Sequence, residues 1–127
     1  MKKNMVSWFE IPVSDMNRAK AFYDNVFGVS IMIQDFGGTL MGWFPYEADK
    51  LGISGSLIKN KAYTPSESIG ALVYFNTEDI DDSLKKVKAN GGTLLQDKTQ
   101  ISPEIGHMAL FIDSEGNRIA FYTSANG

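Results

Sequence analysis

Apolar and polar residues alternate along Trp8–Val13 and separate two faces. Phe9 and Ile11 fall on one face, whereas Trp8 and Glu10 fall on the other. Because successive side chains of a strand point to opposite sides, this pattern predicts a strand with an apolar core face and a second, mixed face.

Helical spacing replaces the alternation after this strand. Asp15 stands at an N-cap position and Gly28 ends the apolar run, so a helix is predicted between them. The apolar stripe of this helix comprises Met16, Ala19, Phe22, Tyr23, Val26 and Phe27. Three further strands, separated by turn-forming residues, are predicted at Ile31–Phe36, Thr39–Phe44 and Ile53–Lys59. The order of the first half is therefore βαβββ.

The second half repeats the first at an offset of about 64 residues. The segment from Val13 to Met16, followed by Gly28, is echoed by the segment from Thr77 to Ile80, followed by Gly92. The elements predicted here are a strand at Ile69–Asn76, a helix capped by Asp79, strands at Thr93–Gln96, Met108–Ile112 and Arg118–Thr123, and a hairpin turn at Asp113–Asn117.

The repeat predicts one α+β domain over residues 1–127, because modules of about 60 residues are marginally stable alone. Module one covers about 5–60 and module two about 69–124, with a short linker at 61–68. We expect the two tandem βαβββ modules to form a curved mixed sheet around a cup-shaped pocket.

The parity of the strand residues predicts which face lines this cup. The apolar face, assigned to packing under the helices, carries Phe9, Ile11, Val73, Phe75, Ile119 and Phe121. The opposite face carries Trp8, Glu10, Ser56, Ile58, Leu72, Tyr74, Ala120 and Tyr122. Aromatic and aliphatic walls with a few polar groups are typical of a pocket for an organic ligand. The alternative is that this face packs as a second hydrophobic core or as a dimer contact.

Composition narrows the class of protein. The chain has no Cys, which excludes disulfides and thiolate metal sites and fits a reducing compartment; with no apolar signal core at the N-terminus, cytoplasm is expected. Basic residues are scattered among acidic ones and the net charge is -3, so neither nucleic acid nor an anionic membrane is expected as a partner.

Three stretches together carry a resemblance to a known family. They run from Trp8 to Tyr23, over Val26–Gly28, and from Asp113 to Ile119. On these stretches the chain resembles the vicinal oxygen chelate superfamily, which includes glyoxalase I, bleomycin and fosfomycin resistance proteins and extradiol dioxygenases. Within it, the chain is most similar to the group related to lactoylglutathione lyase. The resemblance spans nearly the whole chain and implies a homodimer.

The resemblance also implies a divalent metal held by His and Glu side chains at four strand positions. Those positions fall on Trp8, Ser56, Leu72 and Ala120, and they keep the repeat offset of about 64 residues in two pairs. Indole, isobutyl and methyl groups are not metal ligands, and the chain has a single His. We therefore expect no metal of the family type and no other cofactor.

Glu10 is the carboxylate expected on the pocket face, where it could act as a general base, while Tyr74 and Tyr122 could donate hydrogen bonds to a substrate oxygen. The alternatives are that Glu10 pairs with Arg118 or Lys59, or that it only orients a ligand. His107 is a further candidate for contact with ligand at the rim of the pocket.

The leading hypothesis is a metal-free, dimeric protein that binds a small organic molecule in the cup, as resistance proteins of this superfamily bind drugs. The first alternative is an enzyme, either a lyase or isomerase with Glu10 as base or a dioxygenase-type or glyoxalase-type enzyme with other metal ligands. The second is an interaction module whose apolar sheet face is covered on dimerisation.

Overall fold

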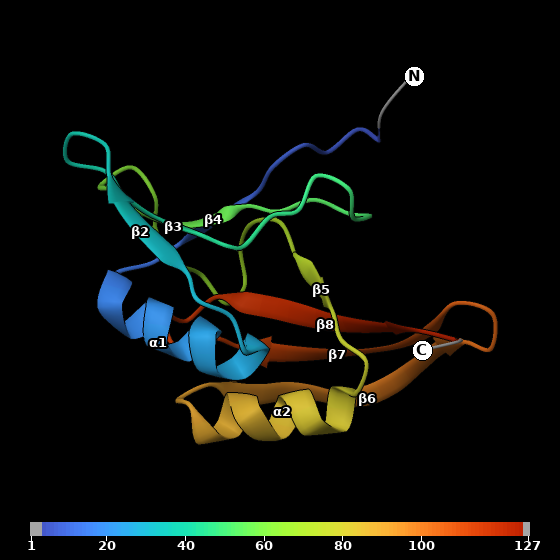
Figure 1. Cartoon of the computed structure of the whole chain (residues 1–127). Helices are drawn as coiled ribbons and strands as arrows, with labels where there is room; N and C mark the ends of the chain where they lie inside the picture. The colour runs from blue at the N-terminus through green and yellow to red at the C-terminus, as the bar shows by residue number, and fades with distance from the viewer. Residues whose placement is uncertain (1–3, 126–127) are drawn as a thin grey trace.

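The computed structural model describes residues 4–125, which form two helices and eight strands (Figure 1). Module one contains β1 (Glu10–Pro12), α1 (Met16–Phe27), β2 (Met32–Asp35), β3 (Leu40–Trp43) and β4 (Ser56–Lys59). Module two contains β5 (Tyr74–Asn76), α2 (Ile80–Ala89), β6 (Thr93–Ser102), β7 (Gly106–Ile112) and β8 (Arg118–Ser124). The α+β class and the two tandem βαβββ modules are confirmed.

Both helices begin at the predicted caps. An Asp15 carboxylate oxygen accepts a hydrogen bond from the backbone N–H of Arg18 at 3.0 Å, and Asp79 accepts one from Asp82 at 3.1 Å. Each bond satisfies a backbone donor that the first turn of a helix leaves free. Helix α1 ends at Gly28, whose φ of 66° is left-handed and favours glycine.

The eight strands form two four-stranded sheets of equivalent topology, in the orders β1-β4-β3-β2 and β5-β8-β7-β6. In each sheet the first strand pairs in parallel with the fourth, and the other pairings are antiparallel. The repeat in the sequence is thus a repeat in topology. Within the described chain, β1 and β5 each form one edge of a sheet.

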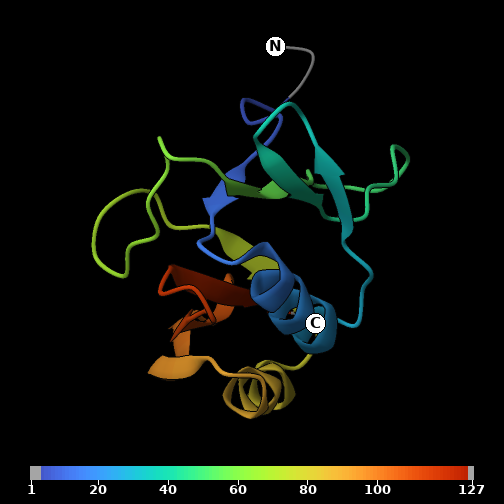
Figure 2. The ribbon, with the colours of Figure 1, turned by 90° about the vertical axis from the view of Figure 1, so that its left-hand side faces the viewer.

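The two sheets share one hydrophobic core with the helices. In Figure 2 the first sheet lies above α1, and the second sheet lies beside α1 and α2. Phe75 joins the modules, because its ring centroid lies 5.7 Å from that of Phe9 and 4.7 Å from that of Phe27. The predicted core-face residues Ile11, Ile119 and Phe121 are buried in this core. The outer faces of the two sheets therefore point away from α1.

The strand boundaries differ from the predicted ranges, and the differences are largest in β5 and β6. Strand β5 starts at Tyr74 rather than at Ile69, because Gly70 has a φ of 105° and interrupts an extended chain. Strand β4 starts at Ser56. Strand β6 continues to Ser102 although its second half is polar, because β7 supplies it with a hydrogen-bonding partner along its length.

The hairpin turn between β7 and β8 fastens module two to the start of α1. The Glu115 side chain is 0% exposed, and its carboxylate accepts two hydrogen bonds from Arg18, the shorter at 2.6 Å. It also accepts the backbone N–H groups of Ser14 and Asp15, each at 2.8 Å. Burial raises the pKa of Glu115, but these hydrogen bonds and the charge of Arg18 outweigh it and lower the pKa below its usual value.

Asp113 makes the second half of this contact. Its carboxylate, 3% exposed as a residue, accepts the Tyr23 hydroxyl at 2.6 Å and the backbone N–H of Asn117 at 2.9 Å. The Asn117 side chain in turn donates to the carbonyl of Pro12 at 2.7 Å. Burial raises the pKa of Asp113, and the hydrogen bonds offset only part of that rise. We call the Asp113–Asn117 turn and these partners the turn clamp.

Candidate ligand-binding faces

Three residues form a row across the outer face of the first sheet. Two of them, Glu10 and Ser56, are predicted site residues, and the third is Trp43. Glu10 on β1 is in register with Ser56 on β4, and Ser56 is in register with Trp43 on β3. Adjacent strands in a sheet lie about 4.8 Å apart, so Ser56 separates a carboxylate from an indole within one short row. Trp8 lies two residues before Glu10, on the same side of the chain by strand parity.

Ser56 is the buried polar group of this row. It is 0% exposed, and its hydroxyl has no hydrogen-bond partner within residues 4–125. Most buried hydroxyls in proteins are paired, so an unpaired one calls for a ligand, a water or a partner chain. Ile58, the next outer-face residue of β4, is also buried and supplies an apolar neighbour.

Three exposed aromatic rings gather on this face. The centroids of Trp8 and Trp43 lie 6.0 Å apart with an interplanar angle of 77°, and Phe36 stacks on Trp43 at 6.1 Å and 20°. We call Trp8, Trp43 and Phe36 the aromatic cluster. Trp43 and Phe36 were not predicted as site residues. Parity along β3 could have identified Trp43, because it alternates with the buried Gly42.

Glu10 is exposed on the single chain, and no ion pair involving it is formed among the described residues. Arg118 lines the same cavity of about 250 Å³ as Glu10, but the two groups do not form an ion pair. Lys59 alternates with Ile58 and therefore lies on the opposite face of β4. The apolar enclosure expected around Glu10 is not present in one chain.

The second sheet presents the other half of the predicted lining. Tyr74 on β5 is in register with Ala120 on β8, and Tyr74 is 51% exposed. The Tyr122 hydroxyl donates to the carbonyl of Ile105 at 2.6 Å, so it is not free to donate to a substrate oxygen while that bond lasts. Leu72 lies just before β5 and is partly buried.

His107 lies apart from these residues. It is in register with Thr123, whereas its neighbour Met108 is in register with Tyr122. Because side chains alternate along a strand, His107 and Tyr122 project from opposite faces of the second sheet. The structure does not bring His107 together with the other predicted site residues.

Each chain therefore separates the predicted lining into two faces. Trp8, Glu10, Ser56 and Ile58 belong to the first sheet; Leu72, Tyr74, Ala120 and Tyr122 belong to the second. The two sheets are not hydrogen-bonded to each other, so these residues lie on two separate sheets of one chain.

The four positions that would hold the family's metal are divided in the same way. Trp8 and Ser56 lie in module one, and Leu72 and Ala120 lie in module two. Their donor set does not fit a divalent metal, because it offers one neutral hydroxyl and no imidazole or carboxylate. Over residues 4–125, no group of three or more His, Asp or Glu side chains is placed to hold a metal ion.

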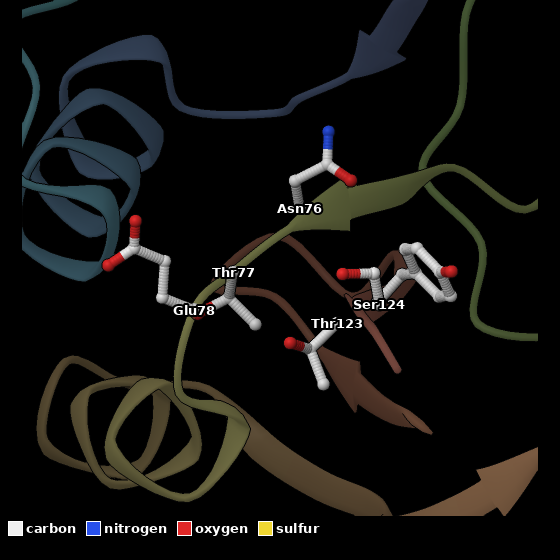
Figure 3. Close-up of a pocket in the computed structure, with 6 residues that line it drawn as sticks. Asn76, Thr77, Glu78, Thr123 and Ser124 are labelled. Atoms are coloured by element: carbon white, nitrogen blue, oxygen red, sulfur yellow. The ribbon is translucent and has the colours of Figure 1, made fainter. Parts of the chain in front are cut away.

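Two further cavities are lined by residues other than Glu10, Ser56 and Trp43. One of about 650 Å³ lies between the modules, has no charged residue in its lining, and includes Leu72, Tyr74, Phe75 and the loop at 45–54. Another of about 480 Å³ lies beside the end of β8 (Figure 3). It is lined by Asn76, Thr77, Glu78, Tyr122, Thr123 and Ser124.

Neither described helix is long and apolar enough to cross a membrane.

Comparison with known proteins gives relatives over nearly the whole chain. A "Glyoxylase-like domain-containing protein" from Didymella fabae is 31% identical over 121 residues, which cover 93% of this chain and 92% of that protein. Among solved structures, a mutant of glyoxalase I from Zea mays superposes with a TM-score of 0.71 at 20% identity. The match covers 92% of this chain, and the chain spans 46% of the maize protein, about half its length.

An antibiotic binding protein from a Streptomyces species has a TM-score of 0.65 at 23% identity, with 98% of each chain covered. At this level of identity the two structural matches show the fold alone. The family model described as Glyoxalase/Bleomycin resistance protein/Dioxygenase superfamily matches residues 5–121. With the paired βαβββ modules and a relative above 30% identity, this match shows that the chain belongs to the glyoxalase/bleomycin resistance protein/dioxygenase superfamily.

Proposed function

We propose that this protein binds a small organic molecule against the outer faces of its sheets, in a cup completed by a second copy of the chain. The observation that carries this proposal is the row in which the buried, unpartnered hydroxyl of Ser56 lies between exposed Glu10 and Trp43. A few polar groups set in aromatic surface orient ligands in small-molecule sites.

The homodimer is part of the proposal because one chain leaves both faces open. Strands β1 and β5 are sheet edges, and an edge strand offers unpaired backbone groups to another strand. Placing β1 of one chain beside β5 of a second would bring the face with Glu10 and Ser56 next to Tyr74 of the partner subunit. The ligand would then contact both chains.

Binding of this kind needs no metal at Trp8, Ser56, Leu72 and Ala120, since shape, aromatic surface and one carboxylate suffice. The fold is similar to that of an antibiotic binding protein, which fits a binding function but leaves the ligand of this chain open. A chain without Cys also fits a reducing compartment, and the cytoplasm is the proposed location.

Native mass spectrometry of protein purified without chelator tests the proposal. We expect a dimer without stoichiometric metal, and an organic adduct that is lost on denaturation. Screening organic compounds by thermal denaturation should then give a concentration-dependent rise in Tm, because a ligand that binds only the folded state stabilises it. A monomer that binds no organic compound, or a dimer with one divalent ion per chain, would contradict the proposal.

An interaction module is the second candidate, because large apolar residues are exposed on the outer face of the first sheet. Met32 is 63% exposed and Phe36 is 51% exposed. A dimer in which these residues become buried, and in which no compound changes Tm, would favour this candidate. An enzyme would be favoured instead if Glu10→Gln abolished a turnover activity and kept ligand affinity.

A further inference from the structure

We infer that the ligand is a planar aromatic molecule carrying a basic amine, bound with its ring system against the aromatic cluster and its cation toward Glu10. The inference rests on the proposed function, because it concerns the same face and names the class of ligand. It follows from three properties of that face: the arrangement of its rings, its charge and the free hydroxyl between them.

In the aromatic cluster, two rings are nearly parallel and the third is steeply inclined to one of them. Phe36 and Trp43 are nearly parallel, at 20°, whereas Trp8 stands at 77° to Trp43. The three rings remain 51%, 38% and 40% exposed, in the order Phe36, Trp43, Trp8. A flat ring system could stack on one ring and meet the other edge-on, and these are the two preferred aromatic geometries. An aliphatic ligand would use neither.

The charge next to these rings is negative. Glu10 is exposed, has no ion pair within residues 4–125, and lies one strand from Ser56 and two from Trp43. The outer-face positions of β1, β3 and β4 hold no Lys or Arg. A cation here would gain a carboxylate partner and, over an indole face, a cation–π contact.

A positively charged residue beside Glu10 would oppose the binding of a cation. Arg118 is such a residue, because it lines a cavity with Glu10. It forms no ion pair with Glu10 and is only partly exposed, so the Glu10 carboxylate is left available to a cation. A neutral ligand would cover the Glu10 carboxylate and leave it without water, which is costly. An anion would add repulsion.

Ser56 supplies the third property. Its hydroxyl is buried without a partner between Glu10 and Trp43. A nitrogen in the ring system could accept from this hydroxyl, or an amino group could donate to it, while the cation faces Glu10. Ser56 is 0% exposed, so a ligand reaches its hydroxyl only when the neighbouring side chains move.

Trp8 and Trp43 are the two tryptophans of the chain, so intrinsic fluorescence reports this face directly. The probes are three acridines of one shape at pH 7.5: cationic 9-aminoacridine, neutral acridine and anionic acridine-9-carboxylate. Affinities are measured by calorimetry, and the change in tryptophan emission locates the site. We expect 9-aminoacridine to bind at least tenfold more tightly than acridine and to quench both tryptophans.

Four variants assign the preference to named groups. Glu10→Gln should bring the affinities for 9-aminoacridine and acridine to within about twofold, whereas Glu104→Gln, which removes an exposed carboxylate between β6 and β7, should leave the ratio unchanged. Arg118→Gln should tighten 9-aminoacridine binding about threefold. Trp43→Leu should weaken both acridines at least tenfold. Circular dichroism at 222 nm checks that each variant is folded.

The inference is overturned if acridine or its carboxylate binds as tightly as 9-aminoacridine, if Glu10→Gln keeps the preference, or if none of the three binds. Any of these results leaves the proposed function standing when native mass spectrometry still shows a dimer with an organic adduct. A chain that binds no organic compound at all removes both.

Discussion

Glu115 is the carboxylate with the most hydrogen bonds to distant parts of the chain. It is buried and accepts from the Arg18 side chain and from two backbone N–H groups about 100 residues earlier in the sequence. Since a buried acceptor without partners is costly, these contacts make Glu115 and the start of α1 dependent on each other. Two predictions follow from single residues of the turn clamp.

Replacing Glu115 with Gln should lower the free energy of unfolding at pH 7 by about 2 kcal/mol, because the amide keeps the shape but loses charge-assisted bonds. The folded-state pKa of Glu115 is below its usual value, so the stability it contributes is present above the unfolded-state pKa. That stability is lost as pH falls through the folded-state pKa. In urea denaturation, the difference between wild type and variant should therefore shrink on acidification. An equal loss in exposed Glu104→Gln would refute the assignment.

Replacing Tyr23 with Phe should destabilise the protein by about 1–3 kcal/mol. The ring stays in the core, but the buried Asp113 carboxylate loses the hydroxyl that donates to it at 2.6 Å. Tyr63→Phe, at a residue 44% exposed, is the matched control and should change the unfolding free energy by less than about 0.5 kcal/mol. Equal effects in the two variants would show that the Tyr23–Asp113 bond contributes little.

Among single residues, the sequence predicted those whose interactions lie within one helical turn. Asp15, Asp79 and Gly28 act within one helical turn, so spacing alone identifies them. Asp113 and Glu115 were predicted only as turn residues, because their partners in α1 are about 100 positions away and no local pattern connects them. For the candidate site, parity selected Glu10 and Ser56 but gave no sign that Trp8 would touch Trp43.

The two helices form a natural pair for comparison, because each begins at an aspartate in the same place of its module. We expect Asp15→Ala and Asp79→Ala each to reduce the unfolding free energy by about 1 kcal/mol, the usual effect of losing an N-cap acceptor. Asp49→Ala, in an exposed loop, is the control. Thermal or urea denaturation measures all three, and no loss in either cap variant would show that its helix is held by packing alone.

Strand lengths were predicted less well than helix boundaries. Helices carry their stop signals in the sequence, as at Gly28, whereas a strand extends as far as its neighbour supplies hydrogen bonds. Strand β6 shows this, since its polar second half is extended only because β7 lies beside it. Strand β5 shows the converse, since the positive φ of Gly70 stops an apolar run that looked like strand.

At the scale of the whole molecule, the modules share one core and should unfold together. Phe75 of module two contacts Phe9, Phe27 and Phe44 of module one, so neither module can lose its structure without exposing the other. Both tryptophans lie in module one, whereas circular dichroism reports both modules. We expect the urea transitions from the two signals to coincide. An earlier fluorescence transition would show that module one unfolds separately.

The duplication, the βαβββ order of the elements and the core face could all be predicted from the repeat and from parity. The division of the pocket lining between two separate faces could not. Parity tells which side of a strand a residue occupies, but not whether two sheets of one chain turn those sides toward or away from each other. The relative orientation of the two sheets depends on how α1 packs against Leu57 of the first sheet and against Phe75 of the second.

The two modules are joined by hydrogen bonds at one place and border a cavity at another. The repeat offset maps the turn at 113–117 onto about 49–53, within the loop that borders the cavity of about 650 Å³. The turn at 113–117 is hydrogen-bonded to Arg18 of α1 through Glu115. The loop at 49–53 instead borders the cavity beside β5. Exposed loops tolerate changes of length and sequence better than buried turns do. The loop can therefore vary and change the size of this cavity, while the bonds of Glu115 keep the turn attached to α1.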